Sequence, residues 1–203
     1  MRRAARYSVS AGALLIIAAA IVFDMLPFLL LVLVAAAAHE LGHYLAIRIC
    51  GRGEGAEIRL GPLGVTIRRG PPATYMHEAA IAAAGPLASA LLAMLAALMA
   101  RLTQFEPAYT LSGMSLMFSL FNILPVFPLD GGRVLFAVTA QRFGLTAAER
   151  TVCVISCAVI FALLCAGAYI LVATGTNFTL LGAAAWLLVY YCRNNTGNVF
   201  MSA

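Results

Sequence analysis

The segment "HELGH" places two histidines and a glutamate inside the apolar run 29–49. Residues four apart lie on the same face of a helix, so His39 and His43 can direct a ring nitrogen at one metal ion. Glu40 stands beside that position, which suits a general base acting on a water activated by the metal. Ionisable groups are costly at membrane depth, so this pattern predicts a functional site. The competing interpretation is two helix histidines that neighbouring polar groups satisfy.

A catalytic zinc site usually has three protein ligands, and two residues are candidates for the third. Asp130, in "FNILPVFPLDGGRVLF", is expected at the same membrane depth as the histidines, although it could equally belong to an ordinary Asp-Gly turn. His77 lies on the same side of the membrane, so depth alone does not exclude it. It is expected at a loop–helix junction beside an exposed Glu78.

The chain is expected to break before Asp130. Pro125 and Pro128 remove backbone donors, and irregular backbone at membrane depth is tolerated when it is buried in protein or lines a wet cavity. Gly131 and Gly132 would allow a sharp turn. Asn122 could hydrogen-bond a substrate carbonyl or a backbone group that the break leaves unpaired.

The composition indicates an integral membrane protein. Of 203 residues, 63% are hydrophobic and 10% are charged, whereas soluble domains average about 45–50% and 25%. The net charge of +5 comes from arginine, because the chain has no lysine. These arginines lie between apolar runs, so membrane orientation explains them better than nucleic-acid binding. We predict one domain over 1–203, with core motifs in 27–140 and two further helices in 151–192.

Apolar runs suited to transmembrane helices occur six times, at 7–23, 27–48, 77–101, 108–127, 151–173 and 178–192. The expected fold class is an all-α polytopic membrane protein. After the second run, alternating residues predict a β-hairpin with strands Ala56–Leu60 and Gly64–Arg69. The hairpin is either a surface feature or an edge that pairs with an extended peptide.

The arginines predict the orientation in the membrane. Residues 1–25 could be a cleaved signal peptide, but the run continues into a second span and is better interpreted as an anchored helix. Twelve of the 13 arginines then fall on one side and Arg101 alone on the other. Both termini are therefore expected in the cytoplasm, with the active site towards that side of the cell membrane.

The cysteines give no sign of a disulfide or metal framework. Their number is odd and no C-x-x-C pair occurs. They are expected to be small buried packing residues, at Cys50, Cys153, Cys157, Cys165 and Cys192.

With "HELGH" and "FNILPVFPLDGG", the chain resembles the site-2 proteases, which are intramembrane zinc metalloproteases. The second motif is similar to the family's Asn-x-x-Pro…Leu-Asp-Gly signature, and the resemblance covers residues 7–140. It implies one zinc ion bound by His39, His43 and Asp130, with Glu40 as catalytic base. It also implies a role for Asn122 in substrate handling.

A third segment, "AAAGPLAS", is similar to the family's Gly-Pro-x-x-Asn segment, but Ser89 stands at the position of the asparagine. Any role of this position is therefore in doubt. Gly85 and Pro86 are expected to permit close helix packing or a kink.

The compact form, with no PDZ or CBS domain, is most similar to the sporulation branch, which cleaves a membrane-tethered sigma-factor precursor. The resemblance implies cleavage of a membrane-tethered protein in or near its transmembrane segment. Membrane inhibitor or regulator proteins are further candidate partners, whereas nucleic acid is not expected as a partner. The chain could also form an oligomer. The alternatives are a metal transporter or metal-binding membrane protein, which needs no base at Glu40, and an inactive homologue acting as a binding scaffold.

Overall fold

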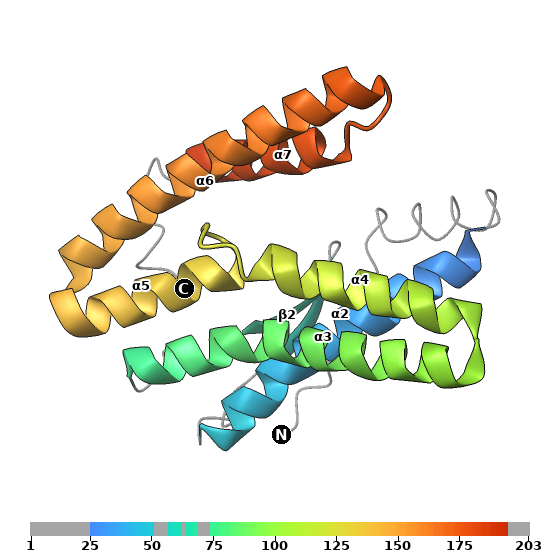
Figure 1. Ribbon diagram of the computed structural model, residues 1–203. Coiled ribbons are helices and arrows are strands. Elements are labelled where there is room, and N and C mark those ends of the chain that lie inside the picture. Colours follow the sequence, from blue (N-terminus) through green and yellow to red (C-terminus); the bar gives the residue numbers. More distant parts are fainter. Residues whose placement is uncertain (1–24, 51–56, 62–63, 69–73, 195–203) are drawn as a thin grey trace. The chain divides into compact units, whose positions relative to one another are not determined.

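The computed structural model describes residues 25–50, 57–61, 64–68 and 74–194 (Figure 1). These residues contain two short strands and six helices, which are α2 (Leu26–Ile49), α3 (Tyr75–Thr103), α4 (Glu106–Asn122), α5 (Asp130–Phe143), α6 (Leu145–Thr174) and α7 (Thr179–Asn194). Five of the six predicted runs coincide with helices, although α4 ends at Asn122 and not at 127 as predicted. The first run, 7–23, lies outside the described residues.

The described helices differ in their capacity to cross a membrane. Three are long and apolar enough to span it, namely α2, α3 and α6. α7 is a shorter apolar helix, and α4 has 17 residues. At about 1.5 Å per residue α4 extends about 26 Å, slightly less than the roughly 30 Å hydrocarbon core. The prediction of six full spans is thus supported for three of the described helices.

The described residues divide into two compact units. The first holds α2, the strands, α3 from Ala83 onward and α4 up to Phe121. The second holds the first turns of α3 and the chain from Asn122 onward. The predicted single domain over 1–203 stays a prediction.

In the first unit, small residues allow α2 to approach α3 closely. A Cβ at Gly42 would overlap the backbone oxygen of Ala84 and lie 2.7 Å from the Cβ of Ala88. Such contacts are typical of helices that pack inside membranes, where small residues bring backbones together. α4 lies antiparallel beside α3 (Figure 1), and the Ser112 hydroxyl donates to the backbone oxygen of Ala93 at 2.8 Å.

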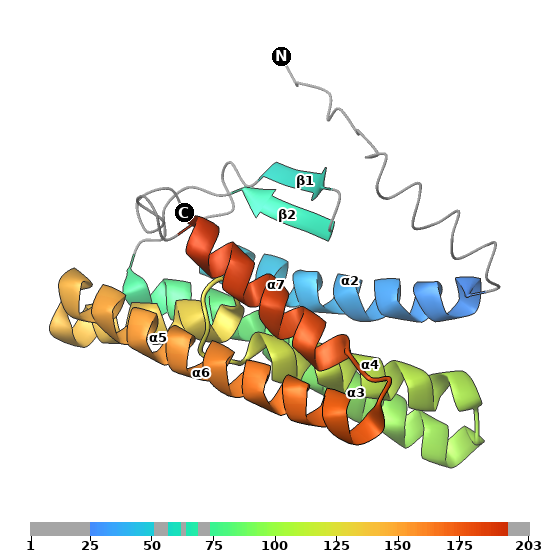
Figure 2. The ribbon, with the colours of Figure 1, turned by 90° about the horizontal axis from the view of Figure 1, so that it is seen from above.

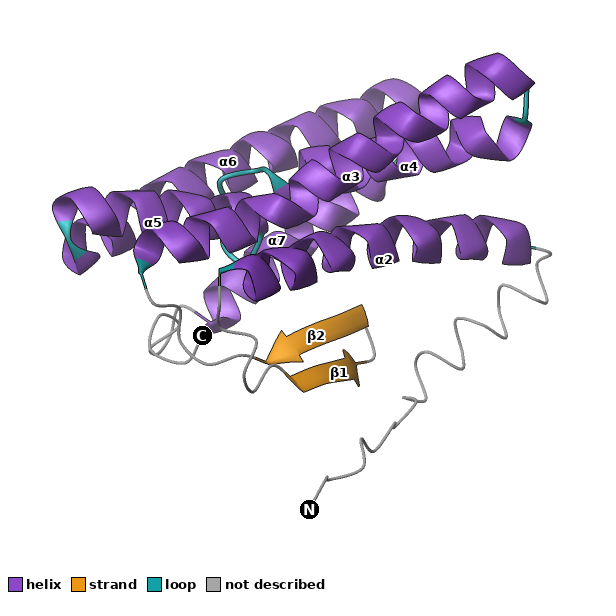
Figure 3. Ribbon diagram, turned by 90° about the horizontal axis from the view of Figure 1, so that it is seen from below, coloured by secondary structure: helices purple, strands orange, loops and turns teal. Residues whose placement is uncertain are grey.

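The strands β1 (Glu57–Gly61) and β2 (Gly64–Arg68) pair antiparallel, from Glu57 opposite Arg68 to Gly61 opposite Gly64. β2 contacts α2, and Figures 2 and 3 show the pair beside that helix. The strand positions agree with the predicted ones to within one residue at each end. Residues 62 and 63, where the hairpin turn is predicted, lie outside the described residues. The turn and the use of this edge for peptide binding stay predictions.

In the second unit, α5 follows directly on the proline-containing break, where Gly131 and Gly132 were expected to allow a sharp turn and an Asp-Gly turn was the alternative interpretation of Asp130. The structure shows no turn there, because Asp130 is the first residue of a 14-residue helix. Gly131 and Gly132 are both helical, and the glycines with positive φ among the described residues are Gly144 and Gly175. Gly144 and Gly175 adjoin the two ends of α6, where the left-handed Gly175 stops the helix.

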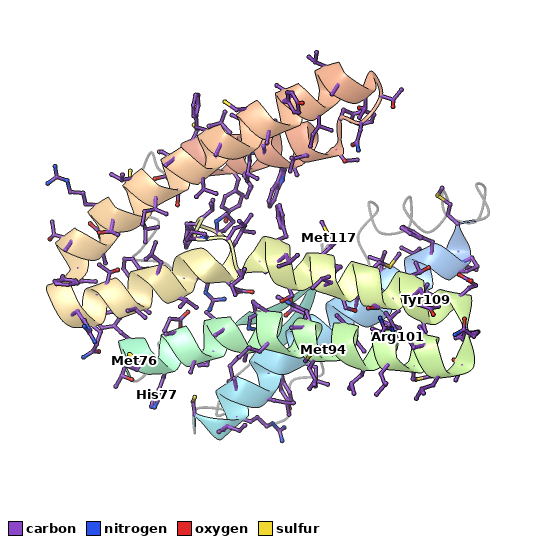
Figure 4. The ribbon with its side chains drawn as sticks, in the orientation of Figure 1. Met76, His77, Met94, Arg101, Tyr109 and Met117 are labelled. Carbon is purple, nitrogen blue, oxygen red and sulfur yellow. The ribbon has the colours of Figure 1, made fainter. Side chains whose placement is uncertain are left out.

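The outer surfaces of the helices are apolar. Figure 4 shows Met94 on α3 and Met117 on α4, whose side chains are 64% and 63% exposed. All five cysteines are free, as predicted, but Cys157, Cys165 and Cys192 are exposed and not buried. A thiol behaves as a small apolar group, so a lipid-facing helix surface accepts it as readily as a protein interior does.

Candidate metal centre

His39 and His43 lie one helical turn apart on α2 and face the same way. Both are buried, with 6% and 9% of their surfaces exposed. Their Nε2 atoms are 3.2 Å apart and their rings are nearly perpendicular, at 83°. Zn–N distances of about 2.0–2.1 Å in a tetrahedron separate neighbouring ligand nitrogens by about 3.3 Å. The two imidazoles therefore fit adjacent ligand positions of one zinc ion.

The space beside the two rings depends on a glycine of α3. A Cβ at Gly85 would overlap Nε2 and Cε1 of His43 and lie 2.8 Å from Nε2 of His39. The expectation that Gly85 permits close helix packing is confirmed, and its closest neighbours are the candidate ligands. One turn further along α3, Ser89 Oγ lies 3.0 Å from Nδ1 of His39, and Ser89 is fully buried.

Glu40 lies between the two histidines in sequence and is half-buried on the same helix. The ring of Phe118, from α4, lies 6.2 Å from the ring of His39 and adds an apolar wall on that side. An acidic side chain adjacent to a buried pair of imidazoles, in apolar surroundings, is suited to proton transfer.

Asp130 is presented by a tightly packed break between α4 and α5. The backbone N–H of Val126 donates to the oxygen of Leu124 at 2.7 Å, and that of Leu129 donates to the oxygen of Val126 at 2.8 Å. Ser156, on α6, accepts from the backbone N–H of Phe127 at 3.2 Å. These bonds satisfy donors of a segment that has no helical partners.

The two glycines after Asp130 let α5 start against this break. A Cβ at Gly131 would overlap the carbonyl group of Ile123, and one at Gly132 would lie 2.6 Å from the nitrogen of Phe127. Their role is thus close approach and not turn formation. The helix N-terminus also carries partial positive charge, which favours the buried carboxylate of Asp130.

Arg133 binds Asp130 and a second acid. Its Nη1 lies 3.3 Å from Oδ1 of Asp130, while Nη2 and Nε lie 2.6 Å and 3.1 Å from Oε1 of Glu78. Glu78 was expected to be exposed, but its side chain is 17% exposed and ion-paired. The Asp-x-x-Arg spacing, one helical turn, is a sequence signal for half of this network.

Two further residues were candidates for the site, Asn122 and His77. Asn122 is the last residue of α4, half-buried at the start of the break. His77 lies in the first turn of α3 (Figure 4), where its backbone N–H donates to Oγ1 of Thr74 at 3.2 Å. Within the described ranges, His77 joins no group of three potential metal ligands, and the candidate set is His39, His43 and Asp130. The histidine pair and Asp130 belong to different units, so their convergence on one ion stays a prediction.

Three comparisons find known proteins that are similar to this chain. The sequence profile of Peptidase family M50 matches residues 98–166, which include Asn122 and Asp130. A zinc metalloprotease of Methanocaldococcus jannaschii is 34% identical over 122 residues, which make up 57% of this chain and 35% of that relative's length. The solved structure of a site-2 protease from the same organism is similar, with a TM-score of 0.62 and 26% identity. The similarity covers 87% of this chain and 82% of that one.

Proposed function

We propose that the chain belongs to peptidase family M50, the site-2 proteases, and that it is an intramembrane zinc endopeptidase, since it is similar to members of that family. It is an integral membrane protein with several helical spans. The observation that carries the proposal is the 3.2 Å separation of two buried imidazole Nε2 atoms, with Glu40 next to the first of them. The substrate class is a membrane-tethered protein, cut in or near its transmembrane segment.

The ligands of the zinc ion are His39, His43 and Asp130. Two neutral imidazoles and one carboxylate form a donor set that zinc enzymes use, with a further position left for the reacting groups. All three side chains are buried, which limits the solvent that competes with them for a metal ion. When bound, zinc supplies Lewis-acid chemistry: it polarises the scissile carbonyl and makes water nucleophilic near neutral pH.

The chain's own residues handle the protons and the substrate. Glu40 accepts the proton of the attacking water and delivers it to the leaving amine, so one carboxylate serves both steps. Asn122 donates its side-chain amide N–H to the scissile carbonyl oxygen as negative charge develops there. Asn122 lies at the end of α4, where the helix breaks. Irregular backbone at membrane depth is found where it lines a water-accessible cavity, which suits a residue that contacts the substrate.

The decisive experiment replaces Glu40 by Gln and co-expresses each form with membrane-tethered candidate substrates. Zinc content should stay at the wild-type level while cleavage stops, because the amide cannot accept the proton. Glu106→Gln, an exposed acid in the first turn of α4, is the matched control and should cleave normally. Metal transport that persists in Glu40→Gln, with no proteolysis by wild type, would instead identify a transporter. Metal binding with neither proteolysis nor transport would identify a binding scaffold.

The substrate's identity and the membrane orientation are part of the proposal. The substrate we propose is the one cut by the sporulation branch, a membrane-tethered sigma-factor precursor, on the resemblance of the strand pair that follows α2. The arginine distribution supports termini in the cytoplasm, with the metal towards the same side. Trapping substrates on the inactive Glu40→Gln form and identifying them by mass spectrometry tests the branch assignment, which an unrelated trapped protein would contradict.

A further inference from the structure

We propose that Ser89 is a positioning residue that fixes the tautomer and the ring orientation of His39 for metal binding. This inference rests on the proposed zinc site and names one of the groups that prepares it. It also assigns a role to a position that the sequence leaves in doubt. The hydrogen bond between Nδ1 of His39 and Oγ of Ser89, at 3.0 Å, joins α2 to α3 across 50 positions of the chain.

The hydrogen bond determines which nitrogen of His39 is free. A neutral imidazole carries one proton, and a hydroxyl oxygen at Nδ1 can accept it, which leaves the lone pair of Nε2 available. Nε2 is the atom that points at His43. Metal-binding histidines commonly donate their other ring N–H to such a partner, which raises the basicity of the ligating nitrogen.

The surrounding helix makes the contact specific. Gly85 and Ser89 are four residues apart and share one face of α3, and both contact the histidine pair. The glycine removes the Cβ that would collide with the rings, so α3 can approach α2. The hydroxyl of Ser89 then reaches Nδ1 from a fully buried position. Water would compete poorly for this bond, because Ser89 is fully buried and His39 is 6% exposed.

A simple packing role for Ser89 makes a different prediction. If the residue only fills space, alanine is nearly isosteric and should leave metal binding unchanged. If it positions His39, its loss should allow the other tautomer and a rotated ring. The structure offers a matched control in Ser115 on α4, which is also fully buried and whose Oγ has no hydrogen-bond partner within the described part of the chain.

The test measures metal affinity in purified full-length protein by competition with a zinc chelator, for wild type, Ser89→Ala, Ser89→Thr and Ser115→Ala. Ser89→Ala should weaken zinc binding roughly 10–100-fold, the effect typical of removing a partner of a ligating histidine. Ser89→Thr keeps the acceptor oxygen and should stay close to wild type, as should Ser115→Ala. The visible absorption spectrum of the cobalt-substituted protein should change in Ser89→Ala alone, because the His39 ring is less constrained.

The outcomes separate this inference from the proposed function. If wild type binds zinc through His39 but Ser89→Ala matches Ser115→Ala in affinity and spectrum, the positioning role is wrong and the metal site stands. If wild type does not bind zinc, or binds it just as well after His39→Ala, the proposed function itself fails. If Ser89→Thr does not fold, as judged by its elution in detergent, the comparison of the two alanine variants still decides.

Discussion

Arg133 and Glu78 form an ion pair between residues 55 positions apart, with 2.6 Å between Nη2 and Oε1. The same guanidinium reaches Oδ1 of Asp130 at 3.3 Å. Asp130 is thus held from one side by a cation that is itself fixed by a second acid. An arginine shared by two carboxylates is less free to rotate than one in an isolated pair. The network should therefore orient the Asp130 carboxylate before any metal binds.

Replacing Arg133 by Gln should weaken zinc binding roughly 10–100-fold, because Asp130 loses its orienting partner. Folding stability should fall by about 1–2 kcal/mol, since the charge-assisted bonds are partly buried. Glu78→Gln should have a smaller effect in the same direction, as it acts through Arg133. Zinc affinity and the detergent melting temperature are the measurements.

Arg142→Gln is the control for this prediction, because Arg142 is exposed on the same helix. It removes the same charge without touching Asp130 and should leave zinc affinity unchanged. If Arg133→Gln and Arg142→Gln behaved alike, the network would be shown to have no part in preparing the carboxylate.

Gly85→Ala should abolish zinc binding and peptidase activity. The added methyl group would overlap His43 and lie 2.8 Å from Nε2 of His39. On helix propensity alone the change would be stabilising, by about 1 kcal/mol, so lost function together with lost stability would indicate the clash. Gly113→Ala, on α4 with nothing near its Cβ, should bind zinc normally. Normal metal binding by Gly85→Ala would contradict the close packing of α3 against the pair.

The parts of the fold that follow from local sequence were predictable. Long apolar runs indicated α2, α3 and α6, because a run of about 20 apolar residues is itself the signal for a span. α5 was not predicted because it lacks a long apolar run: its 14 residues include Arg133, Gln141 and Arg142. It also follows two prolines and has a glycine pair in its first turn. The glycines suggested a turn, whereas the structure uses them for contact with Ile123 and Phe127.

In the candidate site, too, some residues could be predicted from local sequence and others could not. The His39–His43 pair could be predicted because both residues share one helix, where spacing alone sets geometry. Ser89 and Glu78 could not be predicted, because their partners lie 50 and 55 positions away and depend on how helices pack. A serine or a glutamate carries no sequence signal of the partner it will meet.

Asp130→Ala should remove zinc, whereas His77→Ala should keep it. Both residues were candidates for the third ligand, but His77 belongs to no candidate ligand group in the described part of the chain. Bound zinc stabilises the folded protein by about 4 kcal/mol at a thousandfold excess over its dissociation constant. Chelator-stripped wild type and His77→Ala should therefore gain melting temperature on zinc addition, and Asp130→Ala should not. The reverse pattern would make His77 the ligand.

Asn122→Ala should lower kcat by about 100- to 1000-fold, the usual cost of losing one donor to the developing negative charge. Zinc content should be unchanged, because Asn122 is outside the candidate ligand set. Asn177→Ala, in the exposed turn before α7, should cleave at the wild-type rate. If Asn122→Ala lost zinc or failed to fold, the side chain would have a structural role at the end of α4 and would not contact the substrate.

The orientation of the chain can be tested at the two turns that bound α3 and α6. Twelve arginines are predicted on one side and Arg101, near the end of α3, on the other, so the α3–α4 turn should face outward. In a variant with all five native cysteines changed to alanine, Gln104→Cys should react with a membrane-impermeant maleimide in intact cells. Leu145→Cys, at the exposed start of α6, should react after permeabilisation alone. The opposite labelling would invert the orientation, and labelling of both in intact cells would mean that the two turns do not lie on opposite sides. In either case a cytoplasmic opening of the metal site would lose its support, because it depends on this count of arginines.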